Sequence, residues 1–245
     1  MDKLSVRQQE ILKQLEGGLI VSCQAKKDDP IYLPGIIEKM AESAIWGGAA
    51  GLRLDKPENI KAVRPLTNLP IIGLWKQHDP SSPVFITPTL EAAKAVIEAG
   101  ADIVAVDATD RMNRSGSKAY QLIEQIKQHY PEILVLADIR NDQDARLAIE
   151  AGAELVAPTL YRFDPEAKST EHPDFKMLAR IVKAVKGQAH VLMEGKIHTP
   201  EEAIESMYLG AYAVVVGSAI TRPHLTTLRF TQKLNRYDKD MPLYY

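Results

Sequence analysis

Lys76 and Glu194 are the two residues of this sequence whose chemistry stands out first. Lys76 ends the apolar run IIGLWK, and Glu194 follows the apolar residues of HVLMEGK (190–196). Desolvation of a lysine at the end of a buried strand lowers its pKa and makes the neutral amine available as a base, whereas a nearby carboxylate acts in the opposite direction. The two residues could therefore form an acid–base pair. A Schiff base on the lysine and a solvated strand end are the alternatives.

A glycine-containing turn near the C-terminus is the second chemical signal. In VVVGSAITRP (214–223), Gly217 and Ser218 lead into a predicted helix start, where backbone N–H groups and the positive helix end suit a phosphate. The preceding apolar run supplies a second glycine, Gly195, and a cation, Lys196. We predict that these four residues bind phosphate. Two tight turns that only need glycine would give the same pattern.

Eight short apolar runs recur along the chain and are separated by segments with helical spacing. The runs are continuous rather than alternating, as in parallel strands that are covered on both faces. Several of the intervening segments begin at a residue suited to cap a helix, namely Thr89, Asn141 and Thr199. The eight predicted strands are residues 19–25, 49–55, 70–76, 102–109, 133–139, 155–160, 190–196 and 213–219.

A repeated Gly-Ala follows every second predicted helix and precedes a strand. The glycines are Gly48, Gly100, Gly152 and Gly210, separated by 52, 52 and 58 residues. Each interval holds two strand–helix units, so four double units account for eight strands, and glycine suits the position that ends a helix. The pattern predicts a single (β/α)8 TIM barrel. A doubly wound open sheet is the alternative fold, but no G-x-G-x-x-G follows the first strand.

The whole chain is expected to form one domain. No shift in composition marks an internal boundary, so residues 1–245 are predicted to be a single TIM barrel with an N-terminal helix over 1–16. A C-terminal tail over 236–245 is polar and then aromatic. It is either disordered or packs on a neighbouring subunit through Leu243 and the two tyrosines that follow it.

Polar side chains at the strand ends converge on one mouth in such a barrel, and that mouth is where the active site lies. Here the strand ends carry a mixture of cations, carboxylates and neutral polar groups. Any one of them could simply mark where a strand meets a polar loop. Burying part of such a set is costly, however, unless its members pair with one another or with a ligand. The set consists of Gln24, Arg53, Lys76, Asp107, Asp138, Thr159, Glu194 and Arg222.

The composition indicates which cellular compartment and which classes of binding partner to expect. With 45% apolar residues, 25% charged residues and a net charge of −2, the 245-residue chain has no basic field for nucleic acid. A single cysteine, Cys23, excludes an internal disulfide and fits a reducing cytoplasm. No signal peptide and no run near the roughly 18 apolar residues of a membrane span is present. The histidines lack metal-ligand spacing, so we expect a soluble cytoplasmic protein without a metal centre.

Several motifs, in the same order along the chain, resemble those of the N-acetylmannosamine-6-phosphate 2-epimerase family, a TIM barrel of the ribulose-phosphate-binding type. The matching motifs are SCQA, GLRL, IIGLWK, ITPT, ADI, MEGK and VVVGSAITRP. The resemblance runs from about Gly17 to Phe230, which is nearly the whole chain. SCQA and VVVGSAITRP together with ITPT make it more specific than a general barrel signature.

The resemblance implies a cofactor-independent isomerase that converts N-acetylmannosamine 6-phosphate to N-acetylglucosamine 6-phosphate in the catabolism of sialic acid and aminosugars. Opening of the sugar ring exposes the C1 aldehyde and acidifies the C2 proton, whose removal gives an enolate that is reprotonated on the other face. The resemblance makes Lys76 the base and Glu194 the second catalytic group, and it implies a homodimer. The implied substrate-binding residues are Gln24, Arg53, Asp138 and Arg222.

Three departures from the family pattern bear on the substrate. Gln77 follows Lys76 where the family has an arginine, and Lys196 replaces an arginine that could grip phosphate with a fork of donors. The sixth strand continues as APTLYRFDPEAK, in which only Thr159 and Leu160 match. Two alternatives therefore stay open. One is an epimerase or isomerase that acts on a different sugar phosphate, and the other is a catalytically silent phosphosugar-binding barrel.

Overall fold

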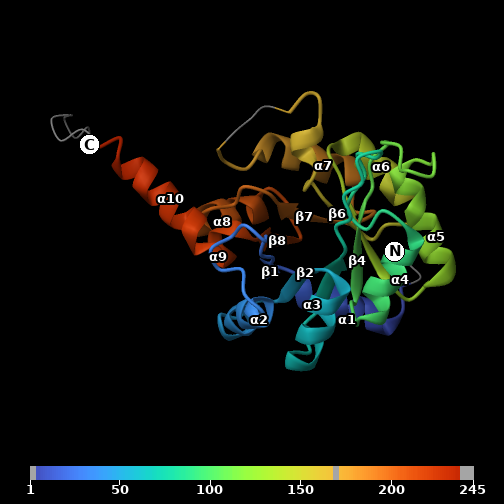
Figure 1. Ribbon diagram of the computed structural model, residues 1–245. Helices are drawn as coiled ribbons and strands as arrows, with labels where there is room; N and C mark the ends of the chain where they lie inside the picture. Colours follow the sequence, from blue (N-terminus) through green and yellow to red (C-terminus); the bar gives the residue numbers. More distant parts are fainter. Residues whose placement is uncertain (1–3, 168–170, 238–245) are drawn as a thin grey trace.

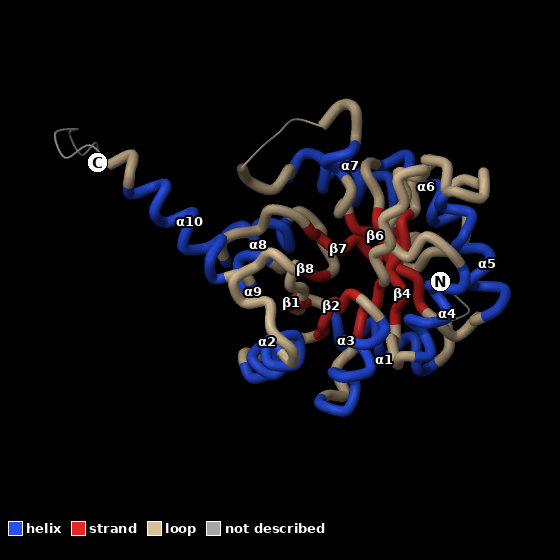
Figure 2. The backbone as a smooth tube through the Cα atoms, viewed as in Figure 1, coloured by secondary structure: helices blue, strands red, loops and turns tan. Residues whose placement is uncertain are grey.

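The computed structural model describes residues 4–167 and 171–237. Within these residues, eight parallel strands pair in chain order and close into a barrel, because β8 pairs with β1 (Figures 1 and 2). The closed barrel confirms the predicted (β/α)8 fold and excludes the open sheet. The strands are β1 Leu19–Cys23, β2 Gly51–Asp55, β3 Ile71–Leu74, β4 Ile103–Asp107, β5 Leu134–Asp138, β6 Leu155–Ala157, β7 His190–Glu194 and β8 Ala213–Val216.

Burial on both faces explains why the strand sequences are apolar throughout. In β3, Ile72 and Leu74 belong to the cluster that fills the barrel, whereas Ile71 packs in the outer layer. Side chains alternate along a strand, so a residue between two outward-facing neighbours points inward. Leu52 and Leu54 of β2 pack in the outer layer. The residue between them, Arg53, is therefore directed into the barrel.

The N-terminal end of the barrel is closed by helix α1 Val6–Leu15. Ser5 caps this helix in a reciprocal pair with Gln8, which fixes where it begins. Leu12 and Leu15 are buried in the cluster that fills the barrel. The hydroxyl of Tyr212, the residue before β8, donates to the Leu12 carbonyl at 2.8 Å. The open end of the barrel is consequently the one at the C-terminal ends of the strands.

Helices cover the outside of the barrel (Figure 1). They begin where the sequence predicts, because the hydroxyls of Thr89 and Thr199 and the side-chain carbonyl of Asn141 accept hydrogen bonds from the first turn of the following helix. Thr199 forms a full capping box with Glu202. The bounds are α2 Ile36–Trp46, α3 Pro57–Val63, α4 Leu90–Glu98, α5 Leu122–His129, α6 Asp142–Glu150, α7 Phe175–Val185 and α8 Pro200–Tyr208, with 3-10 turns η1 Arg64–Leu66, η2 Ala119–Gln121 and η3 Tyr161–Phe163.

The repeated glycines end the helices as predicted. Gly48, Gly100, Gly152 and Gly210 each stand two residues after the last residue of a helix, with φ of 85°, 103°, 106° and 96°. A side chain disfavours this left-handed backbone, and glycine adopts it freely. The repeat in the sequence is therefore a repeat of helix stops, one for each double strand–helix unit.

The chain leaves the barrel after β8. Helix α9 Ser218–Thr221 makes only one turn, and α10 Pro223–Leu234 contains no buried residue and projects away from the barrel (Figure 1). No helix among the described residues is both long and apolar enough to cross a bilayer. The predicted tail over 236–245 falls outside the described residues from position 238 onward.

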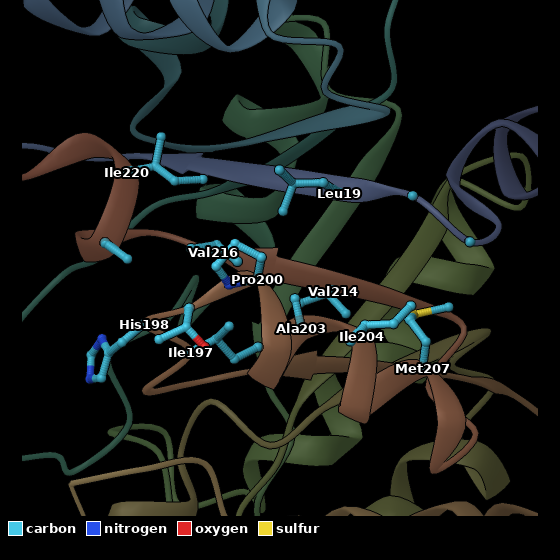
Figure 3. Close-up of a pocket in the computed structure, with 14 residues that line it drawn as sticks. Leu19, Ile197, His198, Pro200, Ala203, Ile204, Met207, Val214, Val216 and Ile220 are labelled. Carbon is cyan, nitrogen blue, oxygen red and sulfur yellow. The ribbon is translucent and has the colours of Figure 1, made fainter. Parts of the chain in front are cut away.

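An apolar groove of about 480 Å³ lies on the outer face of the barrel beside α8. In a (β/α)8 barrel the helix after each strand packs against the outside of the barrel, and α10 does not do so here. Figure 3 shows the side chains of β1, β8 and α8 that surround the groove. They include Leu19, Val214, Val216, Ala203, Ile204 and Met207.

Candidate active site

Arg53 links carboxylates from the far side of the barrel. Its guanidinium is 2% exposed and donates to Asp138 Oδ2 at 2.6 Å and to Glu194 Oε2 at 2.8 Å. The Thr159 hydroxyl donates to the other oxygen of Asp138. Burial lowers the pKa of Arg53, but the charges of Asp138 and Glu194 outweigh it and leave the pKa raised. Arg53 therefore stays a cation and holds both carboxylates in fixed positions.

Glu194 titrates near neutral pH. Burial raises the pKa of its carboxyl to about 7, and the charge of Asp138 acts in the same direction, while Arg53 and Lys76 oppose both. The side chain is 18% exposed, so one side of it opens to the cavity. A carboxyl with such a pKa can donate or accept a proton at physiological pH, which is what general acid–base catalysis requires.

Lys76 lies two residues beyond β3, which ends at Leu74, earlier than the predicted strand. Its Nζ donates to Gln24 Oε1, and Gln24 in turn donates to Ser22 Oγ at 3.0 Å. Burial lowers the pKa of Lys76, and Arg53 adds to this effect, whereas Asp55 and other carboxylates oppose it. The lowered pKa increases the fraction of neutral amine, as the position at the end of an apolar run predicts.

Asp55 belongs to the same cluster, although the sequence reasoning did not single it out. Its Oδ1 accepts the backbone N–H of Lys76 at 2.9 Å, and burial raises the pKa of its carboxyl. Asp55 stands two residues after Arg53 at the end of β2. Alternation along the strand places both residues on the inner face, and this spacing is the signal that could have revealed it.

Two adjoining cavities occupy the mouth of the barrel. The smaller, of about 320 Å³, is lined by Arg53, Thr159, Gly195 and Lys196 among others. The larger, of about 900 Å³, is lined by Asp55, Gly217, Ser218 and Arg222 among others. Four residues line both cavities, and they are Gln24, Lys76, Arg162 and Glu194. The candidate acid–base pair therefore lies where the two cavities meet.

The predicted phosphate-binding residues are divided between the cavities. Gly195 and Lys196 form a tight turn, with φ of 119° and 58°, at the smaller one. Gly217 and Ser218 begin α9 at the larger one, where the Thr221 hydroxyl holds the turn by donating to the Gly217 carbonyl at 3.1 Å. The prediction of a single phosphate grip from all four residues remains a prediction, because two separate walls carry them.

Asp138 and Arg222, two of the predicted substrate-binding residues, differ in how they meet the cavities. Asp138 is fully buried behind Arg53 and is not among the described residues that line the two cavities. Arg222 lines the larger cavity, and its Nη2 lies 2.6 Å from Asp29 Oδ2. His224 lies 3.3 Å from the other oxygen of Asp29. Asp138 thus acts on the cavity through Arg53, whereas Arg222 faces the cavity directly.

The unusual sixth loop contributes to both cavities. Arg162, in η3, lines both of them, and its guanidinium lies 4.7 Å from the centre of the Phe163 ring. Arg111 lies 5.3 Å from the same ring, which also meets Phe85 edge to face at 6.0 Å. Gln77, another departure from the family pattern, is not among the described residues that line either cavity, whereas Lys196 lines the smaller one. The sixth loop and Lys196 are therefore the departures that can affect substrate choice.

The chemical character of the site rests on side chains and backbone groups. Within residues 4–167 and 171–237, no group of three His, Cys, Asp or Glu residues is arranged to hold a metal ion. Cys23 is fully buried, and burial raises the pKa of its thiol to about 12, so it is not a nucleophile here. The arrangement offers a lysine base, a titrating carboxyl and a buried cation at one point, which suits proton transfer at a carbon next to a carbonyl.

A family model and individual relatives of this chain carry the same description. The family described as "Putative N-acetylmannosamine-6-phosphate epimerase" matches residues 37–236. A protein of Caldanaerobacter subterraneus subsp. tengcongensis, described as "Putative N-acetylmannosamine-6-phosphate 2-epimerase", is 43% identical over 91% of this chain and 93% of its own length. A Cutibacterium acnes protein with the same description is 39% identical over 91% of this chain and 96% of its own.

A solved structure agrees with the sequence matches. The N-acetylmannosamine-6-phosphate 2-epimerase from Clostridium perfringens superposes with a TM-score of 0.85 at 37% sequence identity. The match covers 91% of this chain and 96% of the other. The two chains therefore share the same overall fold over most of their lengths.

Proposed function

Since the chain belongs to the N-acetylmannosamine-6-phosphate epimerase family, we propose that it converts N-acetylmannosamine 6-phosphate to N-acetylglucosamine 6-phosphate through Lys76 and Glu194. The enzyme is a carbohydrate isomerase of this family. One observation carries the residue assignment: Lys76, with its pKa lowered by burial, lies with Glu194 where the two cavities meet.

The proposed reaction is a proton transfer at C2. In the open-chain sugar, the C1 aldehyde acidifies the C2–H bond. Neutral Lys76 takes the C2 proton and becomes an ammonium, while the electron pair of the C–H bond forms an enolate over C2, C1 and O1. Arg53 lines the smaller cavity and places a permanent cation near this developing charge. Return of a proton to the opposite face of C2 gives the 2-epimer.

Glu194 supplies the second acid–base group in this proposal. With a pKa of about 7, it carries a proton on roughly half of the molecules at neutral pH. Its acid form can protonate O1 of the enolate or the opposite face of C2. Arg53 fixes the orientation of this carboxyl by donating a hydrogen bond to Glu194 Oε2. The remaining oxygen, Oε1, is left to face the substrate.

Substrate binding would use the walls of both cavities. Gly217, Ser218 and Arg222 would hold the phosphate from the larger cavity, and the turn at Gly195 and Lys196 would approach it from the smaller one. Gln24 and Asp138 support the reactive groups, since Gln24 contacts the Lys76 amine and Asp138 fixes Arg53. No cofactor is required by these steps.

The proposal is tested with N-acetylmannosamine 6-phosphate in D2O. We expect purified protein to form the 2-epimer and to incorporate deuterium at C2. Lys76→Ala should reduce both by about 10²–10⁴-fold, the usual contribution of a general base, while substrate binding persists. Glu194→Gln should lose about as much. Gln77→Ala is the matched control, because Gln77 adjoins Lys76 without lining either cavity, and it should keep activity.

Two outcomes would contradict the assignment. Deuterium exchange by Lys76→Ala at the wild-type rate would remove Lys76 as the base. A wild-type protein that binds the substrate without forming the 2-epimer or exchanging C2 would be a phosphosugar-binding barrel. A higher kcat/KM with another hexose phosphate would mean that the enzyme prefers a different substrate. The sixth loop, whose Arg162 lines both cavities, would then account for that preference. A series of hexose 6-phosphates with different C2 substituents makes this distinction.

We further propose that the enzyme is a homodimer held by α10. Leu228, Phe230 and Leu234 of this helix are exposed, which is costly for apolar side chains in water. The apolar groove beside α8 lies where a helix following β8 packs in a (β/α)8 barrel. An α10 helix from a second copy would cover this groove, and the exchange by both copies would make a symmetric contact.

The remaining features of the protein follow from the same assignment. We propose that the enzyme is cytoplasmic, because its charged sugar-phosphate substrate is retained inside the cell membrane and the single cysteine fits a reducing compartment. We also propose that the chain is one domain, since the family match and the superposed structure both extend over most of it. We further propose that neither nucleic acid nor a membrane is a binding partner of the enzyme.

A further inference from the structure

Thr87, outside the cavities, has an unusual backbone. It is fully buried, and its φ is 45°, in the left-handed region. This conformation is a genuine outlier for a β-branched side chain, because Cβ and both branches crowd the neighbouring carbonyl groups. Such a residue persists only where surrounding interactions hold it in place, and these positions cluster at functional sites.

Three hydrogen bonds hold Thr87. Its hydroxyl accepts the backbone N–H of Trp75 at 3.0 Å and donates to the Ala105 carbonyl at 2.7 Å. Its own backbone N–H donates to the Trp75 carbonyl at 2.9 Å. Both backbone polar groups of Trp75, the residue before Lys76, are therefore bound by this one threonine.

The contacts of Thr87 replace a rung of the barrel. β3 pairs with β4 through Ile72↔Ile103 and Gly73↔Val104. Continued by two residues, this register would bond the Trp75 N–H directly to the Ala105 carbonyl, as in any parallel ladder. The Thr87 hydroxyl stands between these two groups and bonds to both. Thr87 is thus inserted between the two strands and separates their ends.

The segment around Thr87 completes the separation. The Asp107 N–H, in β4, donates to the Ile86 carbonyl at 2.9 Å, and the Gln77 N–H donates to the Phe85 carbonyl at 2.9 Å. Lys76 and Ile86 form an isolated antiparallel bridge. Residues 85–87 therefore lie between the ends of β3 and β4, and the backbone of Lys76 runs along this segment instead of along β4.

We propose that Thr87 is a positioning residue for the reaction: its hydroxyl, wedged between Trp75 and Ala105, directs the Lys76 amine into the junction of the two cavities. Regular pairing with β4 would send the chain past the mouth along the barrel wall. The inserted threonine instead opens the ladder on the β4 side, while on the β2 side Asp55 accepts the Lys76 N–H at 2.9 Å. The strained φ of Thr87 is the local cost of this arrangement.

Four variants test the wedge in the full-length enzyme, with N-acetylmannosamine 6-phosphate as substrate. Thr87→Val and Thr87→Gly remove the hydroxyl, and Thr87→Gly also relieves the backbone strain, so it keeps the test available should Thr87→Val fail to fold. Thr87→Ser retains the hydroxyl. Thr89→Val is the control, because Thr89 caps α4 through the Ala92 N–H and its loss affects stability alone.

The expected result separates positioning from stability. Thr87→Val and Thr87→Gly should lower kcat by about 10²-fold, the loss that a misplacement of about 1 Å produces, with KM changed only a few-fold. Lys76 would move toward water, so the acid limb of the kcat profile should shift to higher pH. Thr87→Ser should restore both kcat and the pH profile. Thr89→Val should lower the urea midpoint of unfolding without moving either.

The proposal rests on Lys76 as the base, and its failure is distinguishable from failure of that assignment. If Lys76→Ala loses C2 exchange while folded Thr87→Gly keeps wild-type kcat and pH profile, only the role of Thr87 is overturned. If Lys76→Ala keeps C2 exchange, the proposed function itself fails. A Thr87→Ser variant as inactive as Thr87→Gly would also overturn the role of the hydroxyl.

Discussion

At the scale of single residues, the site is governed by how Arg53 shares its charge. One buried cation serves two carboxylates, Asp138 and Glu194, and these are not equivalent. Asp138 is fully enclosed and also accepts a hydrogen bond from Thr159, whereas Glu194 opens to the cavity. The less fully satisfied carboxylate is the one whose pKa is raised to about 7. Burial raises the pKa of Glu194, and its shared pairing with Arg53 lowers the pKa by less. The result is a carboxyl that can exchange protons near neutral pH.

The raised pKa of Glu194 predicts a pH-dependent stability. The unfolded carboxyl has its ordinary pKa near 4.5, so between pH 4.5 and 7 the unfolded chain binds fewer protons than the folded one. The free energy of unfolding should therefore fall as pH rises through this window and level off above pH 7. Relative to Glu194→Gln, the wild-type protein should lose no more than about 3.4 kcal/mol, at 1.36 kcal/mol per pKa unit.

Urea denaturation at pH 4.5, 6, 7 and 8 measures this difference, because titrating groups away from the site contribute equally to the wild-type and Glu194→Gln proteins. A difference that stays constant with pH would show that Glu194 has an ordinary pKa in the folded protein. A difference that grows in favour of the wild-type protein as pH rises would show that its pKa is lowered instead.

At the scale of elements, strand ends and helix ends have different tasks. The helix ends are regular: a glycine with positive φ stops every second helix and returns the chain to the barrel. The strand ends are irregular, because β3 stops short and the segment 85–87 separates it from β4. The regular helix stops return the chain to the barrel, while the irregular strand ends hold the side chains of the candidate active site.

Two helix stops provide a matched pair for measurement. Gly48 and Gly210 have φ of 85° and 96°, but a Cβ at Gly48 would meet nothing within 4 Å, whereas one at Gly210 would lie 2.9 Å from Val182 Cγ1. Gly48→Ala should cost about 1–2 kcal/mol from the left-handed backbone alone. Gly210→Ala should cost about 1–3 kcal/mol more, because valine has little rotamer freedom to move aside. Equal losses in urea unfolding would mean that α7 yields without cost.

At the scale of the whole molecule, the barrel has one open mouth and one uncovered side. α1 closes the opposite end, so among the described residues the barrel opens at the C-terminal ends of its strands. On the side, the apolar groove beside α8 is uncovered, and α8 ends at Tyr208, whose side chain is 85% exposed. Apolar surface of this extent on both α10 and the barrel fits a chain that is complete only as a pair.

The dimer proposal predicts the effect of changing α10. The full chain should sediment as a dimer, and a chain ending at Arg222 should sediment as a monomer. Leu228→Asp should weaken the dimer at least about tenfold, since a charge in an apolar contact is not compensated. Arg229→Gln is the control, because helical spacing places Arg229 on the side of α10 that faces away from Leu228, Phe230 and Leu234.

Sedimentation over a range of concentrations decides between the outcomes. A full chain that is monomeric throughout would mean that α10 either stays exposed or folds onto its own barrel, and it would overturn the proposal. A dimer that persists in the chain ending at Arg222 would place the contact elsewhere on the surface.

Local signals in the sequence determined most of the architecture. Apolar runs of strand length, helix caps such as Thr89 and the repeated glycines are each set by near neighbours, and together they predict an eight-fold strand–helix repeat. The closed barrel follows from this repeat. The same pattern places Lys76 and Glu194 at one mouth, because all parallel strands end on the same side. The sequence alone therefore predicts that the candidate acid–base pair lies at one mouth.

The tertiary structure decided which polar groups touch. Arg53 and Glu194 are 141 positions apart, and only closure of the barrel brings them to 2.8 Å, so the raised pKa of Glu194 has no local signature. Likewise, the sequence does not show that Thr87 separates β3 from β4 or that α10 leaves the barrel. Short-range preferences fix where an element begins and ends, whereas contact across a closed barrel depends on the geometry of all eight strands together.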